Sequence, residues 1–263
     1  MDQNIKIIFV DIDWTILSHY KGKHVFDKAS IRALKKAQKR GVKVCICTAR
    51  AYHSVVYTGL LKIFKPDGLI ISNGGLVMID DKIIKEINFT EKNYQKMIDV
   101  ANELGLTMQI TEAYGAFFTR EPNEYVDHVF AIYQEAYPKV EDYKNRKGIN
   151  AVVFCTSDYD EKLIAKLPKE MHIFRYYDYA VEIIEEEHIK AEGIKDVLKY
   201  YNISTDNVLT IGDDVQDISM FELSKYSACM GNGKEEVKPY ATYITAPIEK
   251  HGVKKALKYY KVI

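Results

Sequence analysis

The sequence of 263 residues contains only four cysteines, and its 37 basic residues are balanced by 37 acidic ones. The cysteines form no Cys-x-x-Cys pair; they are Cys45, Cys47, Cys155 and Cys229. We therefore expect small buried thiols in a reducing compartment, and neither a zinc site nor a disulfide. The zero formal net charge argues against a broad nucleic-acid footprint and against a surface for anionic membranes.

Long hydrophobic segments are also missing from the sequence. No apolar run approaches the length that is needed to span a membrane. The N-terminus lacks the basic region, the apolar stretch and the small-residue cleavage site of a signal peptide. We therefore expect a cytoplasmic protein that has no membrane or nucleic-acid partner.

Apolar runs alternate with helical patterns at both ends of the chain. The runs at 7–10, 42–46, 68–71 and 208–211 are typical of strands buried on both faces. Segments 27–40 and 192–201 carry apolar residues at helical spacing, and 252–260 fits a closing amphipathic helix. This alternation predicts an α/β fold with a doubly wound, mainly parallel sheet.

The pattern changes in the middle of the chain. Residues 76–79 and 82–85 flank Asp80 and Asp81, which indicates a hairpin about an acidic turn. From residue 85 to 186, short strands and helices alternate irregularly and aromatic residues are frequent. We predict a core domain formed by residues 1–84 and 187–263, with an inserted α+β domain at 85–186.

Polar side chains follow the predicted parallel strands. Asp11 and Asp13 follow the first strand, and the others are Thr48, Asn73, Asp213 and Asp217. The carboxyl ends of parallel strands form the edge where such sheets bind ligands. Two adjacent carboxylates there need a cation or a shared proton to offset their repulsion.

Together with Lys190, which precedes a predicted helix, this set meets the needs of phosphoryl transfer through an aspartyl intermediate. One carboxylate attacks phosphorus, and a second carboxyl group donates a proton to the leaving oxygen. A cation neutralises charge, while a hydroxyl and an ammonium hold the phosphate oxygens.

Two other interpretations of the Asp11 segment are less satisfactory. A calcium EF-hand loop would need glycine at Ile16 and a bidentate glutamate at Gly22, so that interpretation fails. A turn with capping aspartates is possible for an isolated pair, but it does not predict the second acidic cluster that begins at Asp213.

The ordered motifs resemble those of haloacid dehalogenase (HAD) superfamily hydrolases, specifically Cof-like phosphatases with the type IIB (C2) cap. Asp11-Ile-Asp-Trp-Thr is similar to their first motif and Thr48 to the second. Lys190 matches the third motif, and the Gly-Asp-Asp-Val-Gln-Asp segment at 212–217 matches the fourth. The resemblance covers nearly the whole chain and implies a HAD-like Rossmannoid core.

The resemblance also implies roles for individual residues. Asp11 would be the nucleophile, and Asp13 the general acid and then the general base. Mg²⁺ would be held by Asp11, the backbone carbonyl of Asp13 and Asp213, with Asp214 or Asp217 in support. The phosphate would be bound by Thr48, the backbone amides of Ile12 and Ala49, Lys190 and Gln216.

The function that this resemblance implies is Mg²⁺-dependent hydrolysis of small phosphomonoesters. Sugar phosphates, nucleotides and phosphorylated cofactors are the expected substrates, and the expected assembly is a monomer or weak homodimer. One alternative is a sugar phosphomutase. Another is a regulatory protein that binds phosphorylated metabolites with weak turnover.

Several positions depart from the family pattern or stay undecided. Trp14 stands where glycine is common, and Gln216 replaces an asparagine that commonly reaches the phosphate. Asn73 could turn the chain or face substrate, and Arg50 could contact phosphate or form a structural ion pair. His19 and His24 are expected in a solvated loop.

Overall fold

The computed structural model describes residues 4–20, 23–133, 136–185 and 189–263. The chain divides into two compact units. The first unit comprises residues 1–50, 58–85 and 189–263, and the second comprises 51–57 and 86–188. Residues 51–57 thus group with the second unit, although the sequence interpretation left them in the core domain. The predicted boundary between residues 186 and 187 lies outside the described residues.

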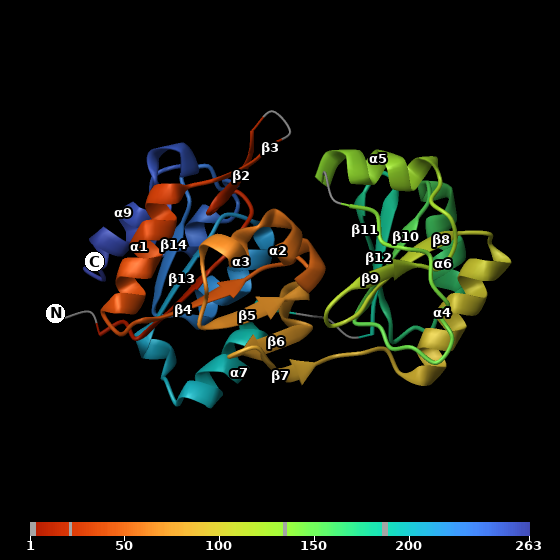
Figure 1. The fold of residues 1–263 in the computed structure, drawn as a ribbon, viewed down its shortest axis with the longest axis horizontal. Coiled ribbons are helices and arrows are strands. Elements are labelled where there is room, and N and C mark those ends of the chain that lie inside the picture. Colours follow the sequence, from red (N-terminus) through yellow and green to blue (C-terminus); the bar gives the residue numbers. More distant parts are fainter. Residues whose placement is uncertain (1–3, 21–22, 134–135, 186–188) are drawn as a thin grey trace. The chain divides into compact units, whose positions relative to one another are not determined.

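The first unit is built on an eight-stranded sheet (Figure 1). Its strands are β1 (Ile7–Val10), β4 (Lys43–Cys47), β5 (Gly68–Ile71), β6 (Leu76–Ile79), β7 (Lys82–Glu86), β13 (Val208–Gly212), β14 (Tyr226–Cys229) and β15 (Tyr243–Ile244). They lie in the order β15-β14-β13-β1-β4-β5-β6-β7. The strands from β15 to β5 pair in parallel, and β6 runs antiparallel to β5. The predicted mainly parallel α/β sheet is confirmed.

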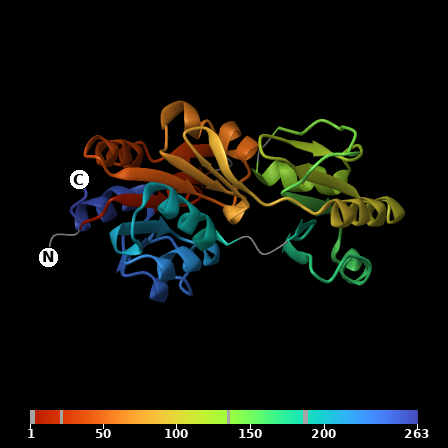
Figure 2. The same ribbon diagram turned by 90° about the horizontal axis from the view of Figure 1, so that it is seen from below.

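Helices cover both faces of this sheet (Figures 1 and 2). The α-helices of the first unit are α1 (Lys28–Lys39), α3 (Leu60–Ile63), α7 (Lys190–Tyr201), α8 (Ile218–Leu223) and α9 (Gly252–Tyr259), whereas α2 (Tyr52–Thr58) lies almost wholly in the segment that groups with the second unit. Ile7 and Phe9 of β1 pack in one cluster with Ile194 of α7 and Phe221 of α8. All four residues of β1 are buried, as expected for a central parallel strand.

Short 3₁₀ helices connect several of these elements. They are η1 (Ser72–Gly74), η2 (Ser157–Tyr159), η3 (Thr205–Asn207), η4 (Val215–Asp217), η5 (Lys238–Tyr240) and η6 (Ile248–Lys250). Two of them follow strands of the large sheet at its carboxyl edge: η1 begins directly after β5, and η4 begins three residues after β13. These two turns therefore orient the side chains that they carry at that edge, including those of Asn73 and Asp217.

A hairpin follows the first strand. Strands β2 (Leu17–Tyr20) and β3 (Lys23–Phe26) pair antiparallel, with His19 opposite His24. The expectation that these two histidines lie in a solvated loop is therefore wrong. Both imidazoles are half-buried, and their ring centroids lie 5.0 Å apart.

The second unit contains a five-stranded antiparallel sheet in the order β11-β12-β10-β8-β9 (Figure 1). Its strands are β8 (Thr107–Thr111), β9 (Ala116–Phe118), β10 (Asn150–Phe154), β11 (His172–Tyr177) and β12 (Ala180–Ile184). Helices α4 (Glu91–Glu103) and α6 (Asp160–Lys166) pack in one apolar cluster with alternate strand residues. Helix α5 (Glu124–Tyr133) packs in a separate cluster with the strand side chains that alternate with these, such as those of Val152 and Phe154. This is the predicted α+β insertion.

The sequence composition predicted buried free thiols and no apolar run long enough to span a membrane. All four cysteines are free and buried, and burial raises the pKa of each thiol. The expectation of buried thiols is confirmed. Within the described ranges, no helix has both the length and the apolar character that crossing a bilayer requires.

Candidate active site

Three strand ends of the first unit bring polar side chains to one edge of the large sheet. Asp11 follows β1, Thr48 follows β4, and Asp213 follows β13. Strand β1 lies between β4 and β13 and is parallel to both, so these ends are neighbours. The backbone amide of Asp11 still donates to Ile211, at 2.9 Å, and only beyond this point does the chain leave the sheet.

Lys190 lies at the first position of α7 and joins two of the carboxylates. Its Nζ donates to Oδ1 of Asp11 at 2.8 Å and to Oδ1 of Asp217 at 2.6 Å. The lysine side chain is only 3% exposed. Burial disfavours its charge, but the two carboxylates outweigh that effect and raise the pKa of Lys190 well above its usual value. The lysine is therefore a fixed buried cation.

Asp11, Asp213 and Asp217 form a group of three buried carboxylates, whose oxygens lie within 4.8 Å of one another. Burial, together with the neighbouring carboxylates, raises the pKa of Asp11 to about 7 and that of Asp213 to about 8. Lys190 lowers the pKa of Asp11 but does not cancel this effect. One ammonium, which contacts Asp11 and Asp217, thus accompanies three carboxyl groups, and a second cation would relieve the remaining repulsion. Buried carboxylate oxygens are the ligands that a hard divalent cation such as Mg²⁺ prefers.

Asp217 also holds the loop that follows β13. Its Oδ2 accepts from the backbone amides of Asp213, at 2.7 Å, and Asp214, at 3.0 Å. A Cβ at Gly212 would lie 2.2 Å from this oxygen, so the turn requires glycine. The Asp213 carboxylate is oriented separately by the hydroxyl of Thr15, which donates to Oδ1 at 2.9 Å.

The two other polar residues of this loop lie outside the group of three carboxylates. Asp214 caps η4 by accepting from the amide of Val215, and its half-exposed carboxylate lies 2.7 Å from Nζ of Lys234. Gln216 is exposed on η4. The structure therefore places Asp217, and not Asp214, beside Asp11 and Asp213.

The remaining predicted residues lie around the same edge of the sheet. The Ile12 carbonyl accepts from three successive backbone amides, those of Thr15, Ile16 and Leu17, and this turns the chain after Asp11. Ala49 is exposed and follows the buried Thr48. The amide of Asn73 donates to the Thr48 carbonyl at 3.1 Å. Its side-chain Oδ1 is buried and has no hydrogen-bond partner in the described part of the chain.

Asp13 is held by an arginine and a histidine. Arg50 donates from Nε to Oδ2 at 2.7 Å and from Nη2 to Oδ1 at 2.8 Å. His19 Nε2 lies 2.5 Å from Oδ1. Burial opposes ionisation of Asp13, but the hydrogen bonds from His19 and Arg50 hold its pKa well below its usual range. In this state Asp13 is a carboxylate.

The sequence interpretation did not assign three residues that now lie in or beside this site. Thr15 had no assigned role, Arg50 was left undecided, and His19 was expected in a loop. Arg50 makes an ion pair, and its amide donates to Oγ1 of Thr48 at 3.2 Å. Its position two residues after Thr48 was the available signal, whereas nothing in the sequence pairs His19 with Asp13.

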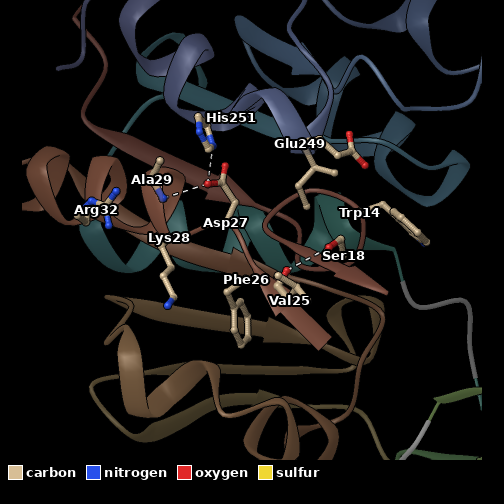
Figure 3. Close-up of a pocket in the computed structure, with 11 residues that line it drawn as sticks. Trp14, Ser18, Val25, Phe26, Asp27, Lys28, Ala29, Arg32, Glu249 and His251 are labelled. Carbon is tan, nitrogen blue, oxygen red and sulfur yellow. Dashed lines mark hydrogen bonds and ion pairs between the residues drawn. The ribbon is translucent and has the colours of Figure 1, made fainter. Parts of the chain in front are cut away.

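A separate cavity of about 640 Å³ lies beside the hairpin (Figure 3). It is lined by the hairpin residues Ser18, Val25 and Phe26, by the start of α1, and by Trp14 and His251. Asp27 accepts there from the amide of Ala29 and lies 2.8 Å from Nδ1 of His251. The lining includes none of the three clustered carboxylates, so this cavity is distinct from the acidic site.

The fold and this site define a class of protein: an α/β protein with a mainly parallel sheet, in which three buried carboxylates and a buried lysine gather at the carboxyl edge. Residues 8–257 match the haloacid dehalogenase-like hydrolase family. The chain belongs to this family and, within it, to the Cof-like phosphatases of subclass IIB. It is a phosphoric monoester hydrolase.

Individual relatives match over almost their full length. The 5-amino-6-(5-phospho-D-ribitylamino)uracil phosphatase YitU of Bacillus subtilis (strain 168) is 24% identical over 281 residues, which is 99% of each chain. A hypothetical protein from Geobacillus kaustophilus HTA426 is 26% identical, with a TM-score of 0.90 over 98% of this chain and 100% of its own. The subclass IIB sugar phosphatase BT4131 is also 26% identical, with a TM-score of 0.80 over 98% and 100% of the two chains.

Proposed function

We propose that this phosphatase hydrolyses small phosphomonoesters with the help of Mg²⁺, through an aspartyl-phosphate formed on Asp11. The observation that carries the proposal is the buried group of Asp11, Asp213 and Asp217, two of which, Asp11 and Asp217, contact the ammonium of Lys190. A buried carboxylate beside a fixed cation is suited to approach an anionic phosphate, because the cation offsets their mutual repulsion.

In the first half-reaction, an Asp11 carboxylate oxygen attacks phosphorus and the bond from phosphorus to the ester oxygen breaks. Asp13 donates a proton to that oxygen, so the leaving group departs as a neutral alcohol. In the second half-reaction, water attacks the phosphorus of the aspartyl-phosphate. Asp13 accepts the proton of that water, and the Asp11 carboxylate and inorganic phosphate are released.

The protonation of Asp13 has to change between these steps. The carboxylate held by Arg50 and His19 is the form that accepts a proton from water. Arrival of an anionic phosphate beside Asp13 disfavours the carboxylate and favours its protonated form. Substrate binding itself therefore prepares Asp13 to act as the acid in the first half-reaction.

The acidic group fits Mg²⁺ in its chemistry, because it offers buried carboxylate oxygens that carry excess negative charge. Asp11, Asp213 and the backbone carbonyl of Asp13 would hold the ion. When bound, Mg²⁺ would neutralise charge between Asp11 and the phosphate. Asp217 accepts hydrogen bonds from Lys190 and from two backbone amides, which suits a supporting role. Asp214, which pairs with Lys234, would support the site from outside.

Groups around the same sheet edge would hold the phosphate oxygens. Lys190 is already fixed beside Asp11, and the Thr48 hydroxyl follows the neighbouring strand. The backbone amides of Ile12 and Ala49 complete the predicted set, and Gln216 is accessible on η4. Asn73, with a buried and unpartnered Oδ1, would face the substrate from the turn after β5.

The inserted segment 85–186 would select the substrate. Two relatives support small metabolites as the substrate class: YitU is named for a phosphorylated ribitylaminouracil, and BT4131 is described as a sugar phosphatase. Sugar phosphates, nucleotides and phosphorylated cofactor precursors are accordingly the compounds to test first.

The test is a screen of such metabolites for phosphate release, with Mg²⁺ and with a chelator. Wild-type protein should release phosphate only with Mg²⁺, and Asp11→Asn should reduce release to background. Asp206→Asn is the matched control, because that carboxylate is exposed and lies elsewhere in the first unit. Phosphate release by Asp11→Asn at the wild-type rate would refute the proposal.

A further inference from the structure

We propose that His19 is a positioning residue that orients the Asp13 carboxyl group for proton transfer. The inference rests on the proposed function, because it assigns a role relative to the acid and base of that reaction. No motif predicted it: His19 lies in the hairpin, six residues after Asp13.

The first observation is that two side chains hold Asp13, a buried Arg50 and a more solvent-exposed His19. The Arg50 side chain is 8% exposed and binds both carboxylate oxygens, whereas His19 is 24% exposed. His19 Nε2 contacts only Oδ1, at 2.5 Å. The two bonds from the guanidinium orient the carboxylate, and the imidazole adds a third contact, on Oδ1, from the hairpin. The two side chains together define one orientation of the carboxyl plane.

The second observation is that backbone contacts tie the hairpin to the Asp13 segment. The amide of Trp14 donates to the Leu17 carbonyl at 2.7 Å, and an isolated β-bridge joins Asp13 to Leu17. Leu17 is fully buried and is the first residue of β2, which carries His19 two residues later. These backbone contacts thus place the His19 imidazole beside the Asp13 carboxylate.

The third observation concerns Trp14, the bulky residue where the family commonly has glycine. Its ring meets that of His19 edge-on, at a centroid distance of 5.6 Å, and His19 in turn meets His24 at 5.0 Å. Trp14 has φ of 53°, in the left-handed region, and Asn232 donates to its carbonyl at 2.9 Å. Non-glycine residues adopt this conformation at a cost. The indole and the second imidazole both contact the His19 ring, which gives Trp14 a packing role beside that imidazole.

The chemical consequence depends on the leaving group. Asp13 matters most when the departing alkoxide is basic and needs a proton as the ester bond breaks. An aryl leaving group is stable as an anion and needs less help. Misplacement of a reacting group by about 1 Å can cost roughly 100-fold in rate. Loss of His19 should therefore slow alkyl esters selectively.

The experiment compares kcat/KM for β-glycerophosphate and p-nitrophenyl phosphate, both with Mg²⁺, because kcat/KM reports the steps up to departure of the alcohol and not the hydrolysis of the aspartyl-phosphate that both esters share. His19→Ala should lower kcat/KM for the alkyl ester roughly tenfold, a part of the ~10²–10⁴-fold that acid–base catalysis supplies. The aryl ester should change by less than about twofold, because its leaving group needs little protonation. His19→Gln should recover most of the loss, since its side-chain amide can donate to Oδ1 of Asp13 as Nε2 does.

Ser18→Ala is the matched control in the same strand. The Ser18 hydroxyl donates to the Val25 carbonyl across the hairpin (Figure 3), and within the described residues it makes no hydrogen bond to the acidic site. This variant should leave both esters unchanged. Equal losses for both esters in His19→Ala, or a selective alkyl loss in Ser18→Ala, would overturn the assignment of His19.

A second measurement tests the contact without turnover. Heteronuclear NMR of the imidazole nitrogens should show the His19 Nε2 resonance moving in Asp13→Asn, while the His251 resonances stay in place. An unmoved His19 resonance would contradict the proposal even if the enzyme is active. If wild-type protein hydrolyses neither ester, the proposed function fails for these probes, and the NMR result still decides whether His19 engages Asp13.

Discussion

The ammonium of Lys190 lies 2.8 Å from Oδ1 of Asp11, and both side chains are buried. Their sequence separation is 179 residues, so the contact joins the first strand to the helix that resumes the core after the insertion. This ion pair places a fixed positive charge beside the proposed nucleophile. The stability of the first unit also depends on this lysine, because without it the two carboxylates would lack their buried cation.

Replacing this lysine should therefore destabilise the protein strongly. Lys190→Met removes the charge and leaves Asp11 and Asp217 without their shared donor; breaking a buried pair in this way costs about 3–5 kcal/mol. The free energy of unfolding from urea titration in a chelator is the measurement. Lys195→Met, on an exposed position of the same helix, should change it by less than about 0.5 kcal/mol. Equal effects of the two substitutions would show that the buried pair contributes no special stability.

A second prediction concerns the turn after β13. Gly212→Ala would place a methyl group 2.2 Å from Oδ2 of Asp217, the oxygen that accepts two loop amides. We expect a loss of about 1–3 kcal/mol in unfolding free energy, as for other overpacked sites, and a large loss of activity. Gly115→Ala has open space around the added methyl and serves as control. A fully stable and active Gly212→Ala variant would refute the described geometry of the turn.

The raised pKa values predict how stability depends on pH without metal. Folding raises the pKa of Asp213 to about 8 and that of Asp11 to about 7, so the folded protein binds these protons more tightly than the unfolded chain. This contribution to stability is complete below about pH 4, where the unfolded carboxyls also titrate, and is lost as pH rises through 7 to 8.

The measurement is the urea midpoint between pH 5 and pH 8.5 in a chelator, for wild type and Asp213→Asn. Because one pKa unit corresponds to about 1.4 kcal/mol, the variant should gain a few kcal/mol over wild type at the alkaline end. Added Mg²⁺ should remove that advantage by stabilising wild type, since metal bound only by the folded state adds to its stability. A constant difference between the two proteins across this range would contradict the prediction.

Part of this arrangement could be predicted from the sequence, because the strand pattern is simple. Four apolar runs, each followed by polar residues, place Asp11, Thr48 and Asp213 at one edge once the sheet is known to be parallel. The choice between Asp214 and Asp217 could not be made in this way. It depends on η4, where a turn of three residues directs Asp217 inward and leaves Asp214 with Lys234.

The contact of His19 with Asp13 was beyond prediction for a different reason. Strands β2 and β3 are short and polar, with sequences LSHY and KHVF, so they lack the alternation that identifies a half-buried strand. Their pairing depends on buried Leu17 and on contacts with the Asp13 segment. Such tertiary contacts leave no periodic signal in the sequence.

The most direct test of the central claim is to find the phosphoryl group on the enzyme. The wild-type protein is mixed with p-nitrophenyl phosphate and Mg²⁺, quenched in acid within a turnover, digested and mapped by mass spectrometry. The account predicts a phosphoryl adduct on the peptide that contains Asp11, and its absence in Asp11→Asn. Rapid turnover of the ester with no adduct on that peptide, or with the adduct on another residue, would contradict it.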